Sequence, residues 1–139
     1  MAHFLDTSIL LYAISPHPAE ADKRSVAAAL LNQDDGAISV QVLQEFYVQA
    51  TRPSRAGRLP HDLAVGLLRA WARFPVQETT MPIVEAALEI KSAHGFSYWD
   101  SAIIATARAL GCRQLYSEDM SHGRVVAGVT IVNPFLASG

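Results

Sequence analysis

Four acidic residues lie at the ends of predicted strands or within predicted helices. Together their carboxylates have the chemistry of a divalent-metal site. Carboxylate oxygens are the ligands that Mg²⁺ and Mn²⁺ prefer in proteins. Such ions assist the cleavage of phosphodiester bonds, because they generate a nucleophilic hydroxide and stabilise the leaving oxygen. A metal-dependent phosphodiesterase is therefore one interpretation of these acids, which are Asp6, Glu45, Asp100 and Asp119.

Three of these acids also have an ordinary structural interpretation. Asp6 can cap the helix that follows it, and taken alone this interpretation is as good as the metal site. Glu45 taken alone is better explained as a surface glutamate, and Asp119 as a turn aspartate. The stronger signal is the order of the set: an acid after a strand, one within a helix, one at a helix start and one after a strand.

Asp100 has two interpretations that are compatible with each other. Residues 97–100 read Ser-Tyr-Trp-Asp, which matches the capping box of a helix amino terminus. Asp100 also begins the apolar stripe Ile103, Ile104 and Ala107, which we expect to face the core. A carboxylate at the head of such a stripe costs free energy unless it is satisfied. A metal ion would satisfy it, and the helix amino terminus would assist.

The positions of these acids are set by short strands that alternate with amphipathic helices. Strands are predicted at residues 2–5, 37–40, 114–116 and 129–132. Helices are predicted at 9–13, 20–31, 41–51 and 61–74, from Thr80 to about 94 with Gly95 as its stop, and from Ser97 to Gly111. This alternation is typical of an α/β domain with a parallel sheet. Ligands bind beyond the carboxyl ends of such strands, where Asp6 and Asp119 are expected.

Length and composition indicate one compact domain over residues 1–139, since half of the residues are hydrophobic. The single cysteine, Cys112, cannot form an internal disulfide, and neither a signal peptide nor a long enough apolar run for a membrane span is evident. We therefore expect a cytoplasmic protein with no membrane contact. The net charge of −2 is not that of a typical nucleic-acid binder, so any RNA contact requires a local basic patch.

Several further side chains have two interpretations each. Arg52, Arg55 and Arg58 follow the Glu45 helix, and phosphate contact is weighed equally with a solvated basic loop. Tyr98 and Trp99 have the aromatic rings to stack on bases, although packing in the core or at an interface is favoured. His122 is a weak candidate for a metal ligand. Glu118, the neighbour of Asp119, is the alternative to Asp119 as the fourth acid of the site.

Five segments resemble the motifs of PIN domains. FLDTSIL at 4–10 resembles the opening motif, and SVQVLQEF at 39–46 resembles the helix that bears the family's glutamate. YWDSAIIA at 98–105 and YSEDM at 116–120 resemble the third and fourth motifs, and NPF at 133–135 resembles the usual ending. The resemblance spans nearly the whole chain, and the most similar subgroup is the VapC-like toxins of type II toxin–antitoxin pairs.

This resemblance implies a PIN-like α/β domain with a parallel sheet flanked by helices on both faces. It also implies an endoribonuclease that uses Mg²⁺ or Mn²⁺ and attacks RNA with water. The family frequently forms homodimers and is inhibited by a small antitoxin whose tail fills the active-site groove. On the family pattern the metal is held by Asp6, Glu45, Asp100 and Asp119, with Ser8 and Ser117 supporting these ligands from behind. The same pattern favours Asp119 over Glu118.

Rival functions fit the residues less well. A phosphatase of the haloacid dehalogenase type needs a second aspartate two residues after Asp6, where this chain has Ser8. A non-catalytic module that binds nucleic acid or a protein partner on the same fold would not need all four acids. A nuclease for structured DNA is the third alternative, and the toxin-like motifs favour RNA over it.

Overall fold

The computed structural model describes residues 2–136. Its strands are β1 (His3–Leu5), β2 (Gly36–Ser39), β3 (Val76–Gln77), β4 (Gln114–Tyr116), β5 (Val125–Val126) and β6 (Val129–Val132). Its helices are α1 (Thr7–Ala13), α2 (Ala21–Leu31), α3 (Val40–Thr51), α4 (His61–Trp71), α5 (Met81–His94) and α6 (Tyr98–Ala109), with a short 3₁₀ helix at Pro18–Glu20.

The strands form one sheet in the order β3-β2-β1-β4-β6-β5. Every neighbouring pair is parallel except β5 with β6, which is antiparallel. The predicted α/β class with a parallel sheet is therefore confirmed, apart from the antiparallel strand β5. Strands β3 and β5 were not predicted, because two residues are too few to display an alternating pattern.

The direction of the chain across the sheet reverses between β1 and β4. From β1 the chain steps to β2 and β3 on one side, whereas β4 lies on the other side of β1, with β6 beyond it. A parallel sheet opens a crevice at such a switch point, outside the carboxyl ends of its strands. Residues that follow β1 and β4 therefore lie at the edge where a ligand is expected.

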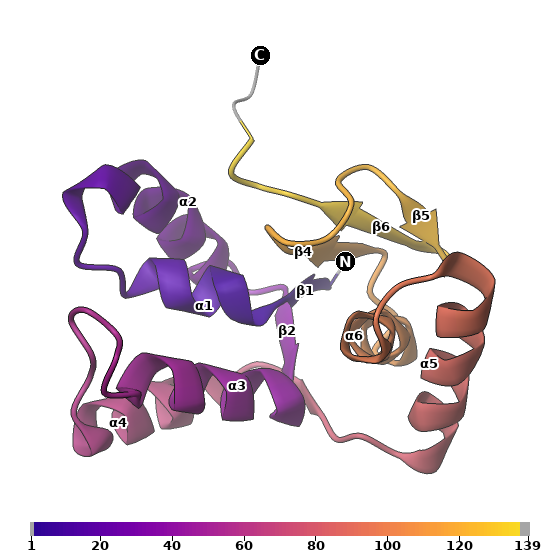
Figure 1. Cartoon of the computed structure of the whole chain (residues 1–139), viewed down its shortest axis with the longest axis horizontal. Helices are drawn as coiled ribbons and strands as arrows, with labels where there is room; N and C mark the ends of the chain where they lie inside the picture. Colours follow the sequence, from indigo (N-terminus) through magenta and orange to yellow (C-terminus); the bar gives the residue numbers. More distant parts are fainter. Residues whose placement is uncertain (1, 137–139) are drawn as a thin grey trace.

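Helices lie on both sides of the strands, as predicted. In Figure 1, α1 to α4 gather on one side and α5 and α6 on the other. Helix α6 contacts β2, β4 and β6, and α3 contacts β2. The strands supply fully buried side chains to the core between these layers, including Phe4, Ile38, Leu115 and Ile131. Burial of this kind stabilises the fold by roughly 1.5–3 kcal/mol for each large apolar side chain.

The helix boundaries follow local capping chemistry. Thr80 accepts a hydrogen bond from the Ile83 amide at the start of α5, and Gly95 ends this helix with a left-handed φ of 76°. Both features were predicted from sequence. Ser39, at the end of β2, caps α3 by accepting from the Val42 amide at 3.1 Å.

Two predicted details differ from the structure. Helix α4 ends at Trp71 rather than at residue 74, because Phe74 turns into the core, where it is 5% exposed. The fully buried stripe of α3 is Val42, Phe46 and Ala50, shifted from the predicted stripe of Leu43, Phe46, Tyr47 and Ala50. Phe46 packs edge-to-face on Trp71 of α4, with ring centroids 4.7 Å apart. Within residues 2–136, no helix has both the length and the apolar character to cross a membrane.

Candidate active site

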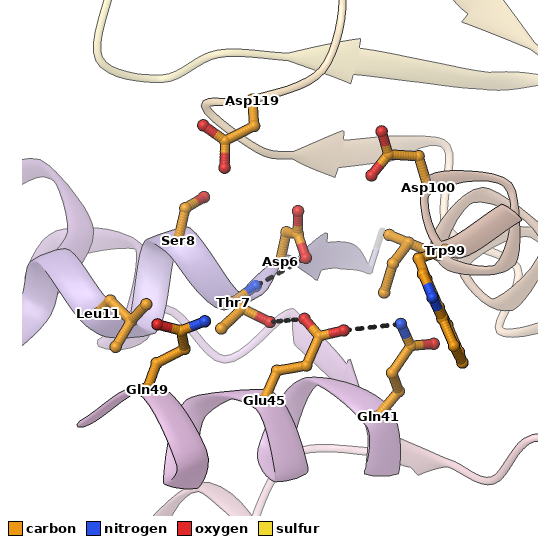
Figure 2. A pocket seen from close by; sticks show the side chains of 11 residues that line it. Asp6, Thr7, Ser8, Leu11, Gln41, Glu45, Gln49, Trp99, Asp100 and Asp119 are labelled. Atoms are coloured by element: carbon orange, nitrogen blue, oxygen red, sulfur yellow. Dashed lines mark hydrogen bonds between the residues drawn. The ribbon is translucent and has the colours of Figure 1, made fainter. Parts of the chain in front are cut away.

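The four acids predicted from the sequence line one pocket at the switch point of the sheet. It encloses about 220 Å³ and is bordered by Asp6, Thr7, Ser8, Leu11, Gln41, Glu45, Gln49, Trp99, Asp100, Ile103 and Asp119. Figure 2 shows Asp6 in the middle of the group, with Asp119 and Glu45 on opposite sides of it and Asp100 beside α6. Four separate segments of the chain therefore deliver one carboxylate each.

Asp6 is the most constrained of the acids. It follows β1 and caps α1, where its Oδ1 accepts from the Thr7 amide at 2.8 Å. Its Oδ2 accepts from the buried Ser117 hydroxyl, also at 2.8 Å. Desolvation raises the pKa of Asp6 to about 6, the two hydrogen bonds oppose this rise, and repulsion from Glu45 and Asp100 adds to it. The capping role and a role in the pocket are therefore compatible for this residue.

Glu45 has both carboxylate oxygens fixed by neighbours. Its Oε2 accepts from the Thr7 hydroxyl and its Oε1 from the Gln41 side-chain amide, each at 2.9 Å (Figure 2). Thr7 thus holds two acids at once, since its amide binds Asp6 and its hydroxyl binds Glu45. Thr7 is only 8% exposed, so this link is shielded from competing water.

Asp100 and Asp119 complete the pocket from the far side of the switch point. The Asp100 amide donates to the Ser97 hydroxyl at 3.1 Å, so Ser97 caps α6 as predicted. Desolvation raises the pKa of the Asp100 carboxyl, the Ser97 hydroxyl lowers it, and repulsion from Asp119 and Glu45 raises it again. Ile103, Ile104 and Ala107 of the expected stripe are buried. Asp119 is exposed on the segment after β4.

The electrostatics of this pocket favour a cation. Among the described residues that line it, four are carboxylates and none is lysine or arginine. The raised pKa values of Asp6 and Asp100 reflect, in part, repulsion among these carboxylates. Oxygen-only donors of this kind suit Mg²⁺ or Mn²⁺.

The spacing of the donors restricts how an ion would be held. Across residues 2–136, no three acidic, histidine or cysteine side chains stand close enough to ligate a single ion as they are arranged. Mg²⁺ commonly retains several waters and binds to one or two carboxylates. The donor set therefore fits a hydrated Mg²⁺ better than an ion enclosed by protein ligands alone.

Ser8 and Ser117, which were predicted to support the acids, occupy different positions around them. Ser117 is fully buried and donates to Asp6, as described above. Ser8 lines the pocket, and its hydroxyl accepts from the Glu118 amide at 3.3 Å. Both serines therefore connect the start of α1 with the segment that follows β4.

The two alternative ligands suggested by the sequence are engaged elsewhere. Glu118 accepts from Tyr12 and from Lys23, which lies 2.6 Å away. Although burial raises the pKa of Glu118, these two hydrogen bonds and the charge of Lys23 hold it below its usual value. The His122 ring accepts from the Asn133 amide at 2.9 Å. Neither side chain is among the residues that border the pocket.

The arginine loop, which carries Arg52, Arg55 and Arg58, lies outside the pocket. Arg52 ends α3, and the other two follow in the loop before α4. Arg58 borders a different cavity, with Tyr47, Thr51 and His61. Gln49, three residues before Arg52, lines the acidic pocket, so Arg52 lies only about 4.5 Å farther along the helix, at 1.5 Å per residue.

Six residues of the pocket were not predicted as site residues: Thr7, Leu11, Gln41, Gln49, Trp99 and Ile103. Gln41 and Gln49 lie four positions before and after Glu45 on one helix, and such neighbours share a face. That spacing could have predicted that both glutamines line the pocket. No sequence signal could have predicted the role of Thr7, because it depends on how α1 packs against α3.

Comparison with known proteins identifies the fold and the family. Among solved structures, a chain of a toxin–antitoxin complex from Klebsiella pneumoniae aligns over 97% of this chain and 98% of its own, with 20% identity and a TM-score of 0.72. VapC20 from Mycobacterium tuberculosis, described as a toxin that cleaves the sarcin–ricin loop, aligns over 82% and 87%, with 19% identity and a TM-score of 0.64. A chain of FitAcB from Neisseria gonorrhoeae aligns over 97% and 99%, with 17% identity and a TM-score of 0.70.

At the level of the sequence, none of the curated proteins matches this chain. The family model of the PIN domain matches residues 3–127, which include all four acids. This chain therefore belongs to the PIN domain family.

Proposed function

We propose that this protein is a metal-dependent endoribonuclease and the toxin of a toxin–antitoxin pair. The observation that carries the proposal is the convergence of Asp6, Glu45, Asp100 and Asp119 on one pocket without a cationic side chain among the described residues. Repulsion within a carboxylate cluster of this kind is relieved when cations bind to it. Cations held there would also offset the repulsion between the carboxylates and an approaching phosphate.

The structural relatives support RNA as the substrate and an antitoxin as the partner. One relative is described as a toxin that cleaves the sarcin–ricin loop, which is RNA. Another comes from a toxin–antitoxin complex, and a further one from FitAB bound to a DNA fragment. We therefore propose an RNA substrate, a small antitoxin protein and a homodimer for this chain, in a cytoplasmic setting.

In the proposed mechanism the four carboxylates hold Mg²⁺ or Mn²⁺. The bound ions would supply a nucleophilic hydroxide at neutral pH and stabilise the leaving oxygen. Thr7 and Ser117 fix the orientation of Asp6, and Thr7 and Gln41 fix that of Glu45. Such hydrogen bonds orient carboxylate ligands before substrate arrives, which is a general requirement of metal sites.

The direct test is cleavage of a defined single-stranded RNA by the purified protein, with Mg²⁺, with Mn²⁺ and with chelator. The test variant is Glu45→Gln, which keeps the size of the side chain and removes its charge. The matched control is Glu85→Gln, on the exposed face of α5. A DNA strand of the same sequence forms the second arm.

We expect metal-dependent cleavage of RNA by wild type and by Glu85→Gln, and at least a hundredfold loss in Glu45→Gln. Attack by water leaves no cyclic phosphate, so cleavage should persist when the 2′-hydroxyl at the cut site is replaced by hydrogen. RNA that is bound but never cut under either metal would favour a binding module instead. Preferential cutting of the DNA strand would assign a deoxyribonuclease.

A further inference from the structure

Trp99 is an exposed aromatic side chain at the rim of the acidic pocket. It borders the pocket, directly precedes Asp100 in the chain, and is 64% exposed. The other tryptophan, Trp71, is 5% exposed and packs on Phe46. The sequence favoured packing in the core or at an interface for Trp99, and the exposure of its side chain contradicts the core alternative. A lone exposed apolar residue is common on protein surfaces, so the position of Trp99, rather than its exposure, carries meaning.

The Trp99 ring is held in place beside the site. Tyr98 contacts it in an edge-to-face arrangement, with centroids 5.1 Å apart and planes at 77°. Figure 2 shows the ring standing beside Gln41 at the edge of the pocket. The following residues of α6, from Ser101 to Ala107, are all buried, so this helix anchors the backbone of Trp99. A preorganised aromatic surface loses little conformational freedom when a ligand stacks on it.

The charge of the pocket suits cations rather than a nucleobase. Its volume of about 220 Å³ is below the roughly 300–1,000 Å³ of pockets that enclose drug-sized ligands. Its four carboxylates suit cations and a phosphate between them, and Leu11 and Ile103 line the rest of it together with polar side chains. A base adjacent to that phosphate can lie at the rim, where Trp99 presents a large exposed ring.

We propose that Trp99 is the stacking platform for an unpaired base next to the phosphodiester bond that is cut. The inference rests on the proposed nuclease function and adds to it the substrate class, an RNA that is single-stranded at the cut. Bases of an A-form duplex are stacked on one another and are not available to a protein ring. Unpaired bases in loops or ends can splay out and stack on aromatic side chains.

The test measures binding, so that it does not depend on cleavage. The protein carries Glu45→Gln to prevent cutting, and Mg²⁺ is used because it does not quench fluorescence. The probes are a short single-stranded RNA and the same sequence annealed to its complement. Affinity is measured for the Glu45→Gln protein alone and with Trp99→Leu, Trp99→Phe or the surface control Leu88→Ala, which alters an exposed residue of α5. Tryptophan emission is followed in the same titrations, since the chain has only two tryptophans.

We expect single-stranded RNA to change the emission of Trp99 and Trp99→Leu to weaken its binding roughly tenfold to a hundredfold, the range of one base stack. Trp99→Phe should retain most of the affinity, Leu88→Ala all of it, and duplex binding should be unaffected by Trp99→Leu.

Equal affinity of Trp99→Leu and its parent for single strands would overturn the inference while leaving the nuclease intact. The inference also fails if Trp99→Leu changes only self-association in sedimentation, because the ring would then belong to a protein interface. Absence of RNA binding by every variant would overturn the proposed function as well.

Discussion

Lys23 Nζ lies 2.6 Å from Glu118 Oε2, and this ion pair joins α2 to the segment that carries Asp119. Lys23 also lies over the ring of Tyr12, whose hydroxyl donates to the same glutamate. The Glu118 amide in turn donates to Ser8 at 3.3 Å. These contacts, which we call the Glu118 clamp, hold both the side chain and the backbone of Glu118. They fix the neighbouring Asp119 without using Glu118 as a ligand.

We therefore expect Lys23→Met to weaken metal binding although Lys23 touches no metal ligand. This ion pair is partly exposed, and pairs near the surface typically contribute about 1 kcal/mol or less, so the melting temperature should change little. Loss of a residue that orients a ligand should lower metal affinity by roughly tenfold or more. Calorimetric titration of the metal measures this, with Lys91→Met on α5 as the matched control. Unchanged affinity in Lys23→Met would show that the Glu118 clamp does not position Asp119.

The Glu118 clamp should also respond to pH. The pKa of Glu118 is held below its usual value in the folded protein, so its contribution to stability is present at neutral pH. That contribution is lost as pH falls through the folded pKa. Glu118→Gln should therefore reduce the melting temperature at pH 7 by more than at pH 3. A difference of the same size at both values would contradict the ionised clamp.

Asp6 should affect the stability of the metal-free protein with a pH dependence opposite to that of Glu118. Its pKa is raised from 3.8 to about 6, so the folded state binds the proton more tightly than the unfolded state. This stability is present below about pH 4 and is lost as pH rises through 6. A shift of about two units corresponds to on the order of 3 kcal/mol.

Removing the Asp6 charge should accordingly stabilise the metal-free protein at pH 7. Asparagine caps helices as well as aspartate, so Asp6→Asn removes the charge and retains the cap. Asp62→Asn, in the exposed first turn of α4, is the control and should not stabilise. Chemical denaturation in chelator at pH 4 and pH 7 provides the comparison, and an Asp6→Asn protein that is less stable at pH 7 would refute the prediction.

Divalent metal should raise the melting temperature of the wild-type protein. A ligand at a hundred times its dissociation constant stabilises the native state by about 2.7 kcal/mol, which is a shift of several degrees for a chain of this length. Asp100→Asn should show a smaller shift, since one donor and its charge are gone. An equal shift with millimolar Mn²⁺ in both proteins would place the metal elsewhere.

The arginine loop should contribute phosphate contacts that are sensitive to salt. Each contact to a single strand contributes about 0.7 to the slope of log affinity against log salt. Replacing Arg52, Arg55 and Arg58 with alanine should therefore flatten that slope by about 2, with metal binding intact. A control of equal charge change replaces Arg69, Arg108 and Arg113, which are exposed. Identical slopes in the two triple variants would exclude the loop from the substrate path.

The acids of the site were easier to predict from the sequence than the residues that support them. Asp6 and Asp119 were located because strand ends of a parallel sheet share an edge. Ser117 was predicted to support the acids only through the family resemblance, and Thr7 was not predicted. Both act through side-chain contacts between segments far apart in the chain, which no local pattern encodes. The exposure of Trp99 contradicts the core position, one of the two positions that the sequence favoured for this residue. Apolar character alone does not tell which side of a helix start faces solvent.

The central claim is that the four acids form one metal-dependent cutting site for RNA. Total cellular RNA incubated with the purified, antitoxin-free protein tests it most directly, with Mg²⁺, Mn²⁺ or chelator and with Asp6→Asn and Asp62→Asn alongside. We expect discrete fragments from wild type and Asp62→Asn only when metal is present, and none from Asp6→Asn. Fragments that persist in chelator, or that Asp6→Asn produces at the wild-type rate, would contradict the claim.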